Sequence, residues 1–194
     1  MVPDSKSKVL AALKKNKVMR TAELAKLTSH RSMLRRIADA GDLFHIGAGI
    51  YAHSSIDPFL AAIVAAKKYY PKAVLSNLTA LVIHRLSDER IDRVDIDIER
   101  GSSIKNKVFN VHRVPGKRLI GVTNLQHQGF TIRIYDRERS LCEAYRIDPQ
   151  GTIFFKALKR YLKNGQPDID KIARYDRTLK TDVLSHLRQE LAVA

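Results

Sequence analysis

The sequence has one cysteine, no long hydrophobic run and no glycine-rich phosphate loop, and each absence excludes a class of protein. A single cysteine, Cys142, cannot form an internal disulfide, so the reducing cytoplasm is the expected compartment. No apolar stretch approaches the roughly 20 residues that cross a bilayer, and the opening residues MVPDSKSK lack the hydrophobic segment of a secretory signal. We therefore expect a globular cytoplasmic protein with no membrane partner and no cofactor.

Acidic residues are scarce beside basic ones. The 194 residues contain 35 lysines and arginines against 20 aspartates and glutamates, a formal net charge of +15. A field of this sign attracts polyanions, nucleic acid ahead of an anionic membrane surface or an acidic protein. Part of the basic charge lies beyond residue 56. There it would contact nucleic acid or face an acidic partner protein.

The clearest pattern in the chain runs from Thr21 to Tyr51. Apolar residues at helical spacing, interrupted near Asn16, give way to short β-prone runs around a tight turn that requires glycine. We expect Thr21 to cap the second helix. The expected elements are helices at residues 5–15, 21–27 and 30–41, then a hairpin of residues 43–46 and 50–53 turned at Gly47-Ala48-Gly49. This order is that of a winged helix-turn-helix.

The third of these helices carries arginines on one side. Stepped around a wheel at about 100° per residue, Met33, Leu34, Ile37 and Ala38 share one arc, and the arginines fall on the other. Arginine's planar fork of donors matches a phosphate or the O6/N7 edge of guanine. An ordinary solvated basic face is the alternative. The expected contacts with double-stranded DNA are Thr21, Ser29, His30, Arg31, Ser32, Arg35, Arg36, His45, Gly47 and Gly49. Base reading is assigned to Arg31, Ser32, Arg35 and Arg36.

A boundary is expected at Ser54-Ser55-Ile56-Asp57-Pro58, where Asp57 and Pro58 are typical of a helix start. This divides the chain into a DNA-binding domain (1–55) and a second domain (56–194). The second domain is expected to contain helices at 59–70 and 76–86, strands at 94–99, 107–114 and 129–135, and a helical final third. The predicted class is α+β, a winged helix followed by a mixed α/β domain with a small sheet.

One stretch of the second domain offers a catalytic alternative. Asp95, Asp97 and Glu99 alternate with apolar residues, so one strand face carries three carboxylates, the ligands that Mg²⁺ prefers. A magnesium-dependent nuclease is therefore one hypothesis. We favour a solvated strand face paired with the neighbouring Arg90, Arg93 and Arg100, because no lysine follows at the spacing of common nuclease cores.

No other set of residues indicates catalysis. None of His84, His112 and His127 has a second histidine or cysteine at metal-ligand spacing, so each is expected to be structural. Cys142 is expected to be a small buried residue. We therefore expect no metal site and no enzymatic activity.

Several short stretches resemble one family. They are Gly49-Ile50-Tyr51-Ala52, residues 74–81 (VLSNLTAL), residues 84–88 (HRLSD), residues 94–101, Val111-His112-Arg113 and Arg139-Ser140-Leu141-Cys142-Glu143. In this order they resemble the AbiEi antitoxins of bacterial abortive-infection toxin-antitoxin systems, with Ser140 and Glu143 in place of the family's threonine and aspartate.

The resemblance implies a two-domain repressor that binds inverted repeats in its own promoter through the winged helix. It also implies that the protein counters a cognate nucleotidyltransferase-like toxin. A free-standing regulator with no toxin partner is the alternative. The oligomeric state and the operator sequence stay open.

Overall fold

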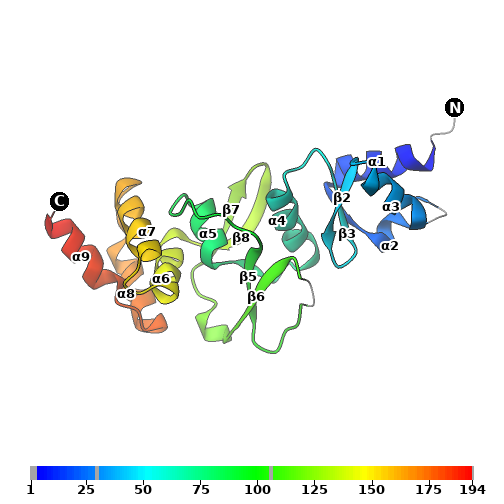
Figure 1. The fold of residues 1–194 in the computed structure, drawn as a ribbon. Helices are drawn as coiled ribbons and strands as arrows, with labels where there is room; N and C mark the ends of the chain where they lie inside the picture. Colours follow the sequence, from blue (N-terminus) through cyan, green and yellow to red (C-terminus); the bar gives the residue numbers. More distant parts are fainter. Residues whose placement is uncertain (1–3, 29–30, 105–106, 194) are drawn as a thin grey trace. The chain divides into compact units, whose positions relative to one another are not determined.

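The computed structural model describes residues 4–28, 31–104 and 107–193, which form a mixed α/β protein (Figure 1). The chain divides into two compact units. The first contains residues 1–71 and 104–109, and the second contains residues 72–103 and 110–194. Among the described residues, no helix has both the length and the apolar character needed to cross a membrane.

The first unit is built from three short helices, a small sheet and a fourth, apolar helix. Its strands have the order β1-β3-β2, and both pairings are antiparallel. Leu13, Leu24, Leu34 and Leu43 meet in one core, which joins the helices to the sheet. The elements are α1 (Ser5–Asn16), β1 (Val18–Arg20), α2 (Thr21–Leu24), α3 (Arg31–Asp39), β2 (Leu43–Gly47), β3 (Ile50–His53) and α4 (Pro58–Tyr69).

The start of α2 differs from the expectation. Thr21 is the first helical residue rather than the cap, because its N–H and its hydroxyl both donate to the carbonyl oxygen of Gly49, at 2.7 and 3.0 Å. Arg20 precedes the helix, and its N–H donates to the carboxylate of Glu23. The helix ends at Leu24, short of the expected residue 27.

Helix α4 belongs to the first unit, which therefore extends to Pro71 rather than ending at residue 55. As predicted, Asp57 caps this helix by accepting from the N–H of Leu60, and Pro58 is at its first turn. The side chain of Lys68 donates to the carbonyl of Val18 at 2.9 Å and pairs with Glu23 at 3.1 Å. These contacts tie the carboxyl end of α4 to β1 and α2, so Ser54-Ser55 is a link inside the unit.

The second unit contains a mixed sheet with the strand order β6-β5-β4-β8-β7. Strand β4 pairs antiparallel with β5 and parallel with β8, and β7 pairs antiparallel with β8. The strands and the first helix are β4 (Val74–Leu75), α5 (Asn77–Ile83), β5 (Val94–Glu99), β6 (Phe109–Val114), β7 (Val122–His127) and β8 (Phe130–Tyr135), with a 3-10 turn at Gly116–Arg118. The sequence does not predict β4 or β7.

The final third is helical, as predicted. It comprises α6 (Arg137–Ile147), α7 (Thr152–Lys163), α8 (Ile169–Leu179) and α9 (Val183–Val193), which gather at one end of the unit (Figure 1). Leu141, Phe154, Leu158 and Leu187 are among the apolar residues of their shared core. Cys142 is buried in it, and burial raises the pKa of its thiol to about 12. The expectation of a small buried residue at this position is confirmed.

Candidate functional site

Helix α3 separates apolar from basic side chains as its sequence predicts. Leu34 and Ile37 are 1% and 2% exposed and lie in the core of the first unit. Ser32, Arg35 and Arg36 are exposed. Arg31 is the first residue of α3, and the expected DNA contacts Ser29 and His30 lie outside the described residues. The helix therefore presents a basic face opposite its core-facing side.

The glycine-tipped hairpin is held by hydrogen bonds within the chain. Gly47, Ala48 and Gly49 all have positive φ, at 136°, 48° and 69°. The N–H of Gly49 donates to Nε2 of His45 at 3.2 Å, and the carbonyl of Gly49 accepts from Thr21. Both donors of Thr21, a residue expected to contact DNA, are thus engaged with the hairpin tip. Thr21 and His45 fix the tip beside the start of α2.

We expect Gly49→Ala to destabilise the protein more than Gly41→Ala. Both glycines have positive φ, which costs a residue with a Cβ about 1–2 kcal/mol. A Cβ at Gly49 would lie 3.0 Å from Oγ1 of Thr21, whereas a Cβ at Gly41 meets nothing within 4 Å. Denaturant unfolding of the two variants separates the backbone strain from the steric contact. Equal losses of stability would show that the contact with Thr21 imposes no cost.

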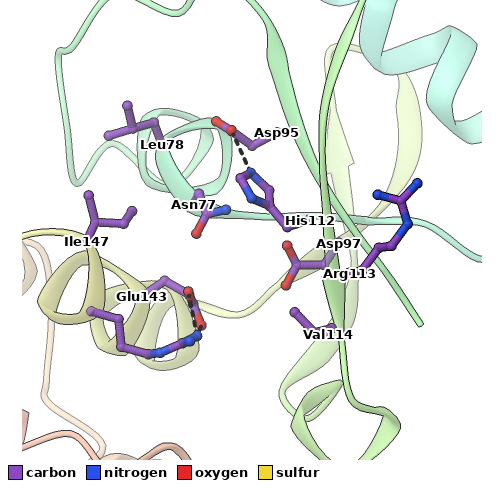
Figure 2. Close-up of a pocket in the computed structure, with 10 residues that line it drawn as sticks. Asn77, Leu78, Asp95, Asp97, His112, Arg113, Val114, Glu143 and Ile147 are labelled. Atoms are coloured by element: carbon purple, nitrogen blue, oxygen red, sulfur yellow. Dashed lines mark hydrogen bonds and ion pairs between the residues drawn. The ribbon is translucent and has the colours of Figure 1, made fainter. Parts of the chain in front are cut away.

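The second unit contains a pocket of ≈ 530 Å³ (Figure 2). Its walls come from the start of α5, strands β5 and β6, and the carboxyl-terminal half of α6. The lining residues are Asn77, Leu78, Asp95, Asp97, His112, Arg113, Val114, Glu143, Arg146 and Ile147. Three carboxylates thus share one pocket with a histidine and two arginines.

The expectation of a solvated acidic strand face is wrong for Asp95 and Asp97, which are only 7% and 2% exposed. Strand β5 lies between β6 and β4, so it is an interior strand, and Val94 and Ile96 on it are buried as well. Alternation of polar and apolar residues indicates an open face only when nothing covers the sheet. Glu99 at the strand end is the exposed member of the three.

Two of the pocket carboxylates have basic partners. Oδ1 of Asp95 lies 3.1 Å from Nε2 of His112, and this hydrogen bond raises the pKa of His112. Glu143 is paired with Arg139 and, at 2.8 Å, with Arg146. Each of these pairs offsets the cost of burying a carboxylate.

Asp97 is the exception. The hydroxyl of Tyr135 donates to its Oδ2 at 2.8 Å. Its Oδ1 is buried and has no hydrogen-bond partner among the described residues. Burial raises the pKa of Asp97 above its ordinary value and outweighs the opposite effect of the Ser76 and Tyr135 hydroxyls. An ionised Asp97 is therefore incompletely compensated by the protein.

Sequence reasoning identified the Asp95–Asp97 pair but not the residues gathered around it. His112 was expected to be only structural, and Glu143 was noted only within a stretch that resembles a family. Neither Glu143 nor Arg146 could be placed beside Asp97, because both come from a helix more than forty positions along the chain. Within the described ranges, no group of three or more His, Cys, Asp or Glu is placed to hold a metal ion. Asp95, Asp97 and Glu99 do not converge as the three ligands of the magnesium hypothesis.

The chain matches no protein-family model, and no curated protein matches it in sequence. Its fold is similar to that of the crystal structure of the RV2827C protein from Mycobacterium tuberculosis, with a TM-score of 0.62 and 15% sequence identity. The similarity covers 91% of this chain and 72% of the other. At this identity the likeness concerns the fold, which is mixed α/β in architecture.

Proposed function

We propose that this protein is a DNA-binding transcriptional repressor whose first unit is a winged helix-turn-helix. Support comes from the order of three helices α1, α2 and α3 followed by the β2–β3 hairpin, which is the order that the sequence predicts. Strand β1, which the sequence does not predict, extends the hairpin to a sheet of order β1-β3-β2. In that arrangement α3 enters the major groove, and the β2–β3 hairpin approaches the backbone beside it.

The observation that carries the proposal is the basic face of α3. Arg35 and Arg36 are exposed while Leu34 and Ile37 anchor the helix in the core. Within the described part of the first unit, the carboxylate of Asp42 pairs with Lys6 and that of Glu23 pairs with Lys68. Among the described side chains, neither carboxylate pairs with an arginine of α3. The two guanidinium groups are therefore available for guanine edges or phosphates, in a chain with a net charge of +15.

We test this function by fluorescence anisotropy with the full chain and a labelled duplex taken from upstream of its own gene. Affinity is expected to fall roughly 10³-fold between 50 and 200 mM salt if about six phosphates are contacted. A scrambled duplex of the same composition is expected to bind at least about 10³-fold more weakly at one fixed salt concentration. Equal affinity for the two duplexes would contradict a repressor that recognises an operator.

The antitoxin role is a further part of the proposal and depends on the resemblance to AbiEi proteins. The proposed partner is a cognate nucleotidyltransferase-like toxin in the same cytoplasm, encoded beside this chain. Co-expression of the full chain with the product of the adjacent reading frame is expected to restore growth that the neighbour alone arrests. If the neighbour arrests growth and this chain does not restore it, the free-standing regulator is the correct alternative.

A further inference from the structure

The pocket of the second unit contains one acceptor that the protein leaves unpaired. Asp95 is hydrogen-bonded to His112, and Glu143 is paired with Arg139 and Arg146, so both carboxylates have partners within the protein. Asp97 is only 2% exposed. Burial raises its pKa more than the hydroxyl groups of Ser76 and Tyr135 lower it, and its Oδ1 has no hydrogen-bond partner among the described residues. Leaving such an acceptor unsatisfied is costly, and buried acceptors of this kind commonly meet a donor.

Figure 2 shows how the side chains that line the pocket are arranged. The carboxylate of Asp97 is turned into the pocket, on the side where Asn77 and Glu143 also lie. Leu78 and Ile147 lie at the opposite wall and offer apolar surface. A ligand that fits these features has N–H donors at one end and an aliphatic stem at the other.

The donor set favours a planar organic cation over a metal ion. No metal-binding group of three acidic, histidine or cysteine side chains is found in the described ranges. A guanidinium group carries donors in a fork that matches a carboxylate, and it is more weakly hydrated than an ammonium group, so it enters a half-enclosed pocket at lower cost. Its aliphatic stem can pack on apolar residues while the charge meets the acid.

We propose that this pocket binds a guanidinium group, with Asp97 as its principal acceptor. The group is carried either by a small molecule or by an arginine side chain of a partner protein. The residues of this site belong to the second unit, and the proposed DNA contacts belong to the first. Burial raises the pKa of Asp97, and a cation paired with its ionised carboxylate would lower that pKa again.

The test is isothermal titration calorimetry with the full chain and matched probes. The probes are agmatine, the peptide acetyl-Gly-Arg-Gly-amide, and the same peptide with neutral citrulline in place of arginine. Binding of either guanidinium probe, and not of the citrulline peptide, is expected. Binding of agmatine alone indicates that the natural ligand is a small molecule. Binding of the arginine peptide alone indicates an arginine side chain of a partner protein.

Two substitutions connect binding with the pocket. Asp97→Asn is expected to lower the affinity for the guanidinium probe by roughly tenfold or more, because a charged hydrogen bond is lost. Glu99→Gln removes the same charge from the exposed end of the same strand and is expected to leave binding unchanged. Because burial disfavours the ionised carboxylate of Asp97, the Asn variant is expected to unfold at the same temperature as the unmodified chain or at a higher one.

A rim substitution keeps the test valid if Asp97→Asn fails to fold. Ile147 lines the pocket and is 42% exposed, so Ile147→Arg does not disturb the core. Its positive charge is expected to weaken the binding of cationic probes and to have no effect on the citrulline peptide. The proposal is overturned if neither guanidinium probe binds, if the citrulline peptide binds equally well, or if both pocket variants bind as the unmodified chain does.

Discussion

Replacing Arg35 and Arg36 together with alanine is expected to weaken binding of the upstream duplex by roughly a hundredfold or more at fixed salt. Each bidentate contact between an arginine and guanine contributes about 1–3 kcal/mol of discrimination. Both side chains are exposed on α3, while the core contacts of the helix come from its other side. The substitutions should therefore leave folding intact, which circular dichroism and the melting temperature will show.

The single variants distinguish recognition of a base from binding of a phosphate. If Arg35 or Arg36 reads a base, its loss relaxes the preference for the upstream duplex over the scrambled one. If it holds a phosphate, its loss weakens both duplexes and lowers the salt slope by about one. The control is Arg174→Ala with Arg188→Ala, which removes two exposed charges from the second unit. Unchanged affinity in the α3 double variant would exclude this helix as the recognition element.

The parts of the fold that the sequence predicts correctly are those governed by local periodicity. The inward positions of α3 repeat at helical spacing, so Leu34 and Ile37 could be assigned to the core from the sequence alone. The cap and first turn of α4 at Asp57-Pro58 are equally local. Such features need no knowledge of the partner element, because the side chains within a single turn determine them.

The features that the sequence does not reveal depend on distant partners. Strand β1 has only three residues and exists because Val18, Met19 and Arg20 pair with β3, thirty or more positions further along the chain. Asp95 and Asp97 were assigned to solvent because nothing local shows that β5 is covered. The pocket required the register of β5, β6 and α6 together, and a single alternating strand does not contain that information.

The buried arginine of α6 is where we expect the largest change in stability. Arg139 is 0% exposed, pairs with Glu143 one helical turn further on, and stacks over the Tyr135 ring at 4.2 Å. Its NH2 group also donates to the carbonyl of Arg118 at 3.4 Å. One side chain thereby joins α6 to β8 and to the turn before β7.

Arg139→Leu is expected to lower the free energy of unfolding by about 3–5 kcal/mol, because it leaves a buried carboxylate without its buried partner. Glu143 is itself only 4% exposed, and its remaining partner, Arg146, reaches it from the protein surface. Urea unfolding monitored by circular dichroism measures the change. A loss below about 1 kcal/mol, the range of surface ion pairs, would show that the buried pair is not important for stability.

The double variant Arg139→Leu with Glu143→Leu distinguishes the two sources of that loss. If the cost comes from an uncompensated charge, removing both partners should restore much of the stability, since apolar replacement of a buried ion pair is often close to neutral. If it comes from the lost stacking on Tyr135 and the lost bond to Arg118, the double variant should remain as unstable as Arg139→Leu alone. A double-mutant cycle that also includes Glu143→Leu gives the coupling energy directly. We expect a coupling of about 2–3 kcal/mol, because the pair is buried and most of the destabilisation comes from isolating one charge.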